Sequence, residues 1–240
     1  MILTAHQPVY LPWLGLFHTI AISDLFISFD QVQYLKKDWN NRNKIKSQQG
    51  PIWLTVPVLT KGHYKKRICD IEINNSLPWA RKHWRTIKTA YAKAPHFSKY
   101  ADFFEDLYRQ KWDTLNGLNL YMLKWFLQTL GIKVPVRSAG EFHFKGTKST
   151  LVLDMCSQVD ADHYLFGALG KNYADLPSFE QAGISVHFQN YIHPVYPQLH
   201  GEFISHLSII DLLFNCGDES LDRLLSDNVN QAHLRDRNAL

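Results

Sequence analysis

The sequence predicts an α/β fold: a mainly parallel, Rossmann-like sheet flanked by helices, with a helical segment inserted around residues 77–130. Three observations predict it. The first 30 residues hold two apolar runs separated by a loop and a helical pattern, the order of a βαβ unit. Residues 77–130 repeat their apolar positions at helical spacing. After residue 134, short apolar runs alternate with helical patterns again.

The chain opens with a predicted strand, loop and helix. Residues 1–5 are expected to form a short buried strand that ends at His6. Prolines follow at once, beginning with Pro8, and they cannot continue a strand ladder. Apolar residues then recur at three- and four-residue steps over 13–21, which predicts a helix, and residues 25–30 predict a second buried strand.

The next segment is polar before it becomes apolar. Residues 31–50 are basic and polar, which predicts a loop. Residues 53–58 predict a third strand, and Pro57 marks its end or an edge position. Residues 68–74 alternate in polarity, which predicts a fourth strand.

Three helices are predicted between residues 77 and 130. Pro78 suits the first turn of a helix, and Pro95 should end that helix. Gly131 should end the last of the three. No flexible linker flanks the segment, so we expect it to pack on the sheet.

The remaining elements continue the α/β alternation up to residue 217. The expected elements, in order, are a strand at 134–140, a helix at 150–159 with Thr147 or Ser149 as N-cap, a strand at 163–167, a helix near 176–182, a strand at 184–189 and a helix at 206–217. We therefore expect one α/β domain over residues 1–217, and a C-terminal tail or weak helix over 218–240.

Composition limits the class of protein and of ligand. The chain has 240 residues, of which 45% are hydrophobic, so it has enough apolar residues for one core. The net charge of +4 suits an anionic small molecule, such as a nucleotide, a nucleotide sugar or a carrier-bound acyl group. Nucleic acid would require a clustered basic face, which the sequence does not indicate.

Cysteine usage and hydropathy predict a cytoplasmic location. The three cysteines match no metal or redox spacing and fit a reducing compartment. No apolar run reaches the roughly 18 residues of a membrane span, and the first residues lack the basic start of a signal peptide.

The first candidate site follows the first strand. In an open parallel sheet, ligands bind beyond the carboxyl ends of strands, where His6 lies with Gln7 and Tyr10 close by. His6 would act as a base and Gln7 as an orienting amide. The alternative is that His6 only ends a strand and bonds a neighbouring carbonyl. Asp30, at the end of the second strand, would bind a ribose or a metal, act as a base, or merely cap a turn.

The second candidate is the basic segment from Gln33 to Lys46. Arg42 presents a planar fork to phosphate, Asn43 adds amide donors, and Trp39 offers a stacking face to a base or sugar. The segment therefore predicts an anion site. The alternative is a solvated basic loop.

Two further patterns are weaker. Lys145–Thr150 stands between a strand and a helix and would seat a phosphate, but its spacing is not that of a Walker loop, so an ordinary capped helix start is favoured. The late histidines match no metal-ligand pair, and no cofactor is indicated. Asp211, inside an apolar helix, should face a partner or a cleft.

Together these segments resemble the WbqC-like family of bacteria. HQPVYLPWLGLFH, SDLFISFDQVQY, NNRNKIK, WLTVPV, YAKAPHFSKY, HPVYPQ and LSIIDLLFNCG are similar to that family in the same order, over roughly residues 4–217. The departures are small: Val9, Ala139 and Phe166 stand where the family often has Asn, Ser and Ser.

The resemblance implies a role in the biosynthesis of cell-surface polysaccharide of the O-antigen type. The expected activity is transfer of an acyl or aminoacyl group to an amino sugar, with His6 deprotonating the amine and the Arg42 segment holding a phosphate-bearing donor. No nucleophile elbow is visible, so direct transfer is expected. Two alternatives stay open: a Mg²⁺-dependent, nucleotide-activating enzyme of nucleotidyltransferase-like fold, and a scaffold or sugar-binding module with exposed tryptophans at Trp79, Trp84 and Trp112.

Overall fold

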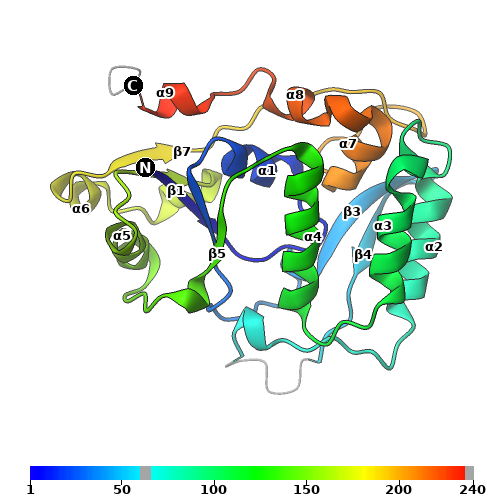
Figure 1. Ribbon diagram of the computed structural model, residues 1–240, viewed down its shortest axis with the longest axis horizontal. Coiled ribbons are helices and arrows are strands. Elements are labelled where there is room, and N and C mark those ends of the chain that lie inside the picture. Colours follow the sequence, from blue (N-terminus) through cyan, green and yellow to red (C-terminus); the bar gives the residue numbers. More distant parts are fainter. Residues whose placement is uncertain (60–65, 236–240) are drawn as a thin grey trace.

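A five-stranded parallel sheet forms the centre of the protein (Figure 1). The computed structural model describes residues 1–59 and 66–235. In the order β5-β2-β1-β6-β7, the strands are β5 (Val136–Ser138), β2 (Leu25–Ser28), β1 (Ile2–His6), β6 (His163–Phe166) and β7 (Ser185–Phe188). The order reverses between β1 and β6, which is the switch point where doubly wound sheets bind their ligands. The predicted mainly parallel α/β fold is confirmed.

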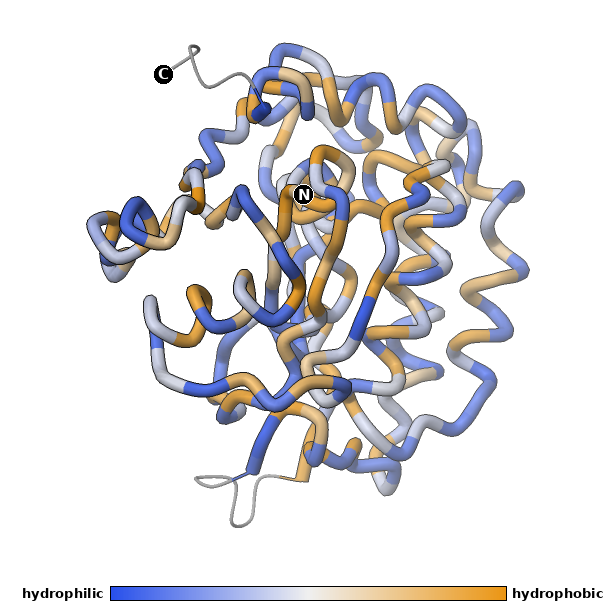
Figure 2. The backbone as a smooth tube through the Cα atoms, turned by 60° about the vertical axis from the view of Figure 1, so that its left-hand side comes forward, coloured by the Kyte–Doolittle hydropathy of each residue, from blue (hydrophilic) through white to orange (hydrophobic). Residues whose placement is uncertain are grey.

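Helices cover both faces of the sheet. Successive side chains of each strand point to opposite faces, so one strand contributes apolar residues to two cores. Phe26 of β2 lies in the larger apolar core, with α1 and α4. Its neighbours Leu25 and Ile27 lie in a second core, with α5 and α6. Figure 2 shows the apolar residues gathered along the central strands and along the inner side of the helices.

The helices agree closely with the apolar periodicity. They are α1 (Leu14–Ala21), α2 (Trp79–Tyr91), α3 (Phe97–Arg109), α4 (Leu115–Leu130), α5 (Lys148–Gln158), α6 (Leu176–Gln181), α7 (Ile209–Cys216), α8 (Ser220–Leu225) and α9 (Gln231–Arg235). The side chain of Thr114 caps α4 by accepting from the Gly117 N–H. The helix ends, as expected, at Gly131, whose φ of 73° is left-handed.

Two local predictions are wrong. The basic segment expected to be a loop contains β3 (Arg42–Ser47), which pairs antiparallel with β4 (Gly50–Thr55) in a separate hairpin. The strand expected at 53–58 therefore belongs to this hairpin and not to the main sheet. The turn lies at residues 48–49, and Gly50, which follows it as the first residue of β4, has a φ of 102° that suits glycine.

The second error concerns residues 68–74, where a strand was expected. A short 3₁₀ helix, Ile68–Asp70, stands there. The reason is a three-residue step: Ile68 and Ile71 are both buried, and the Ile71 N–H donates to the Ile68 carbonyl. The polar and apolar residues therefore alternate without forming a ladder.

The C-terminal segment returns to the start of the sheet. Leu224 of α8 lies in the main core, and Leu234 of α9 packs with Ile2. Asp24 accepts hydrogen bonds from Gln231 and Arg235, each 2.7 Å long. The division into a domain over 1–217 and a tail over 218–240 remains a prediction, and the last five residues of that tail lie outside the described part. None of the helices in the described ranges is long and apolar enough to cross a membrane.

Candidate functional site

Three polar side chains form a row across the carboxyl edge of the sheet. His6 of β1 pairs in register with Ser28 of β2, and Ser28 pairs with Ser138 of β5. Paired residues of parallel strands point to the same face, so all three lie on the side covered by α1 and α4. This edge lies beside the strand-order switch point, where a ligand is expected.

His6 has a defined proton position. Its Nδ1 lies 2.8 Å from the backbone carbonyl of Gln7. A carbonyl can only accept, so the proton of the neutral ring is on Nδ1 and Nε2 keeps its lone pair. Burial lowers the pKa of His6, and the Gln7 carbonyl and the charge of Asp38 only partly offset this. The ring is therefore neutral at pH 7, and among residues 1–59 and 66–235 no partner bonds Nε2.

A row of aromatic rings extends outward from His6. The His6 and Trp13 rings meet edge to face, with centroids 5.2 Å apart. Trp13 lies 5.7 Å from Trp39, and Trp39 lies 5.5 Å from Trp53. We call Trp13, Trp39 and Trp53 the indole row. Trp39 is 38% exposed and Trp53 43%, so the outer part of the row is accessible to a ligand.

Two cations lie at the far end of the indole row. The Cζ of Arg42 is 4.5 Å from the ring centroid of Trp53, and the Nζ of Lys44 is 5.0 Å from it. Both are cation–π distances. The indole row thus connects Arg42 with His6 along one surface, although the two side chains do not touch.

Asp30 joins three elements at the same edge. Its carboxylate is buried, and one oxygen accepts from Asn116 of α4 at 2.8 Å and from Ser138 at 3.0 Å. The other oxygen accepts from Gln31 at 3.0 Å. Both carboxylate oxygens therefore accept hydrogen bonds within the protein, and these bonds hold β2, β5 and the start of α4 together.

The loop that follows β1 is fixed by asparagines of the basic segment. Asn40 donates to the side chain of Gln7 at 3.2 Å and to the Pro8 carbonyl at 2.9 Å. Asn43, which is fully buried, donates to the Leu11 carbonyl at 2.5 Å. Asn43 therefore holds the loop in place and has no surface to offer a ligand.

Tyr10 and Lys46 also lie inside the protein. The Tyr10 hydroxyl is 2.8 Å from Nδ1 of His83 and 2.5 Å from the Tyr108 hydroxyl. Lys46 is 1% exposed, and its ammonium donates to the side chain of Gln198 at 3.1 Å. The structure thus brings His6 and Gln7 to the carboxyl edge and Arg42 to the indole row, and places Tyr10, Asn43 and Lys46 in the core.

Asp211 is the centre of the network that Lys46 joins. Its carboxylate accepts from Tyr91 at 2.7 Å, Tyr196 at 2.9 Å and Gln198 at 2.6 Å. Burial raises the pKa of Asp211, and these donors oppose the rise. The expectation that Asp211 faces a partner is confirmed, and its partners are structural.

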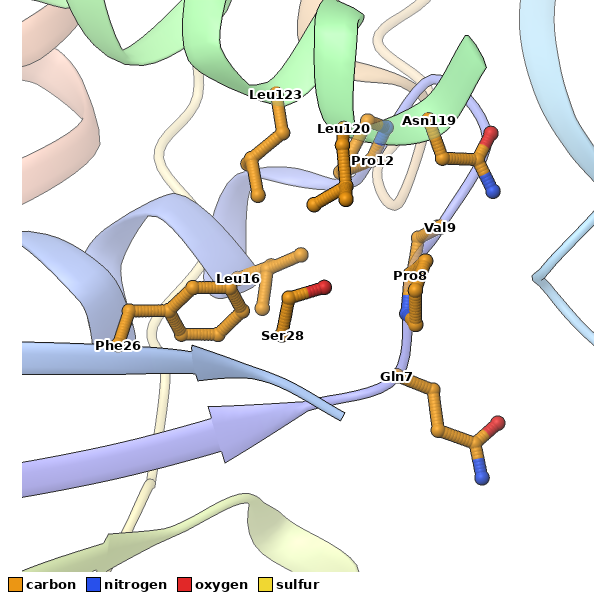
Figure 3. Close-up of a pocket in the computed structure, with 10 residues that line it drawn as sticks. All are labelled: Gln7, Pro8, Val9, Pro12, Leu16, Phe26, Ser28, Asn119, Leu120 and Leu123. Carbon is orange, nitrogen blue, oxygen red and sulfur yellow. The ribbon is translucent and has the colours of Figure 1, made fainter. Parts of the chain in front are cut away.

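A small cavity lies behind the loop after β1 (Figure 3). The centre of a water molecule can move within about 10 Å³ of it, which is room for one water. The Ser28 hydroxyl points into it and has no hydrogen-bond partner within the described ranges. The Gln7 amide points away from it. The cavity is therefore too small to hold a nucleotide or a sugar.

The two weaker candidates, the start of α5 and the late histidines, gain no support as ligand sites. At the start of α5, Oγ1 of Thr150 accepts from the Thr147 N–H at 3.1 Å, as in an ordinary helix start. Across residues 1–59 and 66–235, no three metal-ligating side chains converge. Neither feature adds a ligand site to the carboxyl edge.

Comparison with known proteins identifies the family of this chain. A model of the WbqC-like protein family matches residues 7–223. The chain belongs to the WbqC-like protein family. It is also 37% identical over 220 residues, covering 91% of this chain and 95% of the relative, to "Uncharacterized protein Rv1507c" of Mycobacterium tuberculosis strain H37Rv. No solved structure matches.

Sequence reasoning missed Trp53 and Lys44 as parts of this surface. Trp53 was expected only as the first residue of a third strand, and Lys44 was one basic residue among several. The antiparallel register pairs the two directly. The signal was the polar turn before Gly50, flanked by segments of equal length, which is typical of a hairpin.

Proposed function

We propose that this WbqC-like protein is a transferase of surface polysaccharide biosynthesis, and that it moves an acyl or aminoacyl group to the amine of an amino sugar. The observation that carries the proposal is the proton position of His6. Its neutral ring offers a lone pair on Nε2 at the carboxyl edge, where no described side chain occupies it. Such a group suits a general base at neutral pH.

In the proposed reaction the sugar amine attacks the acyl carbonyl directly. The new C–N bond forms while the amine proton moves to Nε2 of His6. The bond between the acyl carbon and its carrier breaks, and the same proton passes to the departing carrier. Gln7 supports the step. Its amide oxygen accepts a hydrogen bond from Asn40, so the NH₂ group of Gln7 remains free to donate to the developing oxyanion.

The direct test measures transfer from acyl or aminoacyl carriers to amino sugars, by mass spectrometry of the product. Replacing a general base typically costs 10²–10⁴-fold in rate. We expect a loss in that range for His6→Ala and little change for His143→Ala, a matched control at an exposed histidine. Equal rates for both variants would refute the role of His6.

One observation favours a second function. The strand order, with its reversal between β1 and β6, is that of doubly wound nucleotide-binding sheets. A nucleotide-activating enzyme would show ATP binding that depends on Mg²⁺. The transferase requires no such dependence, so one titration with and without Mg²⁺ separates the two.

The scaffold alternative loses its predicted surface. Trp79 is buried, and Trp84 and Trp112 pack against the main core. The prediction of an exposed patch at these three residues is wrong, because each lies on the inner side of the helical segment. The more exposed tryptophans, Trp39 and Trp53, belong to the indole row instead.

A further inference from the structure

Arg42 and Lys44 carry positive charge that the described part of the protein does not neutralise. They stand two residues apart on β3, so both point to the same face of the strand. Within residues 1–59 and 66–235, neither forms an ion pair. The nearby carboxylate of Asp38 accepts the Trp39 N–H at 2.7 Å. Two like charges side by side favour an anion between them.

The guanidinium of Arg42 has one buried donor without an acceptor. Its Nη2 donates to the carbonyl of Lys37, a residue with a left-handed φ of 63°. Its Nε is buried and bonds no described group. An unpaired buried donor is destabilising, so an incoming acceptor that bonds Nε would favour a guanidinium moved out of this position. Phosphate oxygens, bound by the fork of a guanidinium, are such acceptors.

The space between the two cations and His6 is lined by indoles. The ring centroids of His6 and Trp13 are 5.2 Å apart, and those of Trp13 and Trp39 are 5.7 Å apart. Trp53, which lies beneath the two cations, is the next ring in the row. An indole face packs well against the apolar C–H face of a pyranose ring. The surface therefore presents, in order, a base, aromatic rings and two cations.

We infer that this surface binds a glycosyl phosphate: the phosphate on Arg42 and Lys44, the sugar ring on Trp39 and Trp13, and the far side of the sugar at His6. The inference rests on the proposed function for which end of the ligand reacts, and it adds the substrate class. Binding draws Arg42 from its place over Trp53 so that Nε and one Nη bond the phosphate. A nucleotide sugar and a lipid diphosphate sugar share this chemistry.

Titrations followed by tryptophan fluorescence provide the test, because a ligand that binds on the indole row should change the emission of its tryptophans. The probes are glucose 1-phosphate, methyl glucoside and pyrophosphate. We expect glucose 1-phosphate to bind more tightly than either of the other two, and its affinity to fall with salt. UDP-glucose and farnesyl diphosphate, as competitors, tell a nucleotide from a lipid carrier.

The variants separate the subsite from the catalytic proposal. Arg42→Gln and Lys44→Gln should each weaken glucose 1-phosphate binding about tenfold, an effect of one charge-assisted contact. Arg85→Gln, at an exposed arginine of α2, should leave it unchanged. His6→Ala removes the contact at the far side of the sugar but keeps both phosphate contacts, so it should weaken glucose 1-phosphate binding far less than Arg42→Gln does, yet lose transfer.

Two results would overturn the subsite. One is equal affinity for glucose 1-phosphate and methyl glucoside. The other is wild-type affinity in Arg42→Gln and Lys44→Gln proteins that melt at the wild-type temperature. If instead His6→Ala transfers at full rate while the Arg42 variant still loses binding, the catalytic proposal fails and the subsite stands.

Discussion

The Cα atoms of His6 and Ser28 are partners in the parallel ladder of β1 and β2. Because of that pairing, the imidazole and the hydroxyl leave the sheet on the same face. The hydroxyl enters a cavity with room for one water, and the imidazole meets the edge of Trp13. Two neighbouring side chains on one face therefore have different surroundings: Ser28 lies at a closed cavity, and His6 lies beside the indole row, where the ligand is proposed to bind.

Asp30→Asn should lower the free energy of unfolding. The carboxylate accepts from Asn116, Ser138 and Gln31, and an amide in its place would turn a donor toward one of these donors. A lost, buried, charge-assisted bond costs about 1.5–3 kcal/mol. Urea denaturation measures the change.

Asp102→Asn is the matched control for Asp30→Asn, since Asp102 is exposed on α3 and forms no ion pair within the described ranges. We expect its effect to stay within about 0.5 kcal/mol. Equal stability of the two variants would contradict the structural role of Asp30.

Stability should fall as pH falls from about 6.5 to about 4, in part because of His83. Burial lowers the pKa of His83 from 6.5 to about 4, and the backbone of Thr55 offsets this only partly. Between these values the unfolded chain binds the proton more tightly than the folded one, so acid favours unfolding. The full effect of this buried ring is on the order of 3 kcal/mol at pH 4.

The His83→Gln variant isolates that contribution. Glutamine keeps an acceptor for the Tyr10 hydroxyl but does not titrate. Its free energy of unfolding, measured in urea at several pH values, should decline less than the wild-type value below pH 6.5. Parallel curves for the two proteins would show that His83 is not the group involved.

Gly131→Ala should destabilise the end of α4. Gly131 has a φ of 73°, a conformation that costs a residue with a Cβ about 1–2 kcal/mol. Gly167 provides the control, because its φ of −64° suits any residue and a Cβ there would meet nothing within 4 Å. Thermal melts should separate the two alanine variants, and a Gly131→Ala protein as stable as the Gly167→Ala protein would contradict the assignment.

The centre of the main sheet could be predicted because β1, β2 and β6 are largely buried on both faces. All four residues of 25–28 are buried whichever way they point, which is typical of a parallel sheet covered by helices. The hairpin could not be predicted in the same way. In β3 the buried residues include Asn43 and Lys46, on opposite faces of the strand, and their polar groups are satisfied by partners far away in the sequence.

The candidate site could be predicted only in part, for the same reason. The end of the first strand could be predicted to reach the carboxyl edge, since that follows from local order. Whether a polar side chain there turns outward depends on distant residues. Tyr10 turns inward because its hydroxyl forms hydrogen bonds with His83 and Tyr108, and no pattern within the first 20 residues indicates this.

The pH dependence of acyl transfer tests the central claim, that neutral His6 is the base, most directly. Because burial lowers the pKa of His6 below 6.5, kcat/KM should rise with pH through a midpoint below 6.5 and level off by pH 7. In His6→Ala the rate should drop and the midpoint should vanish. A midpoint that persists unchanged in His6→Ala would contradict the account.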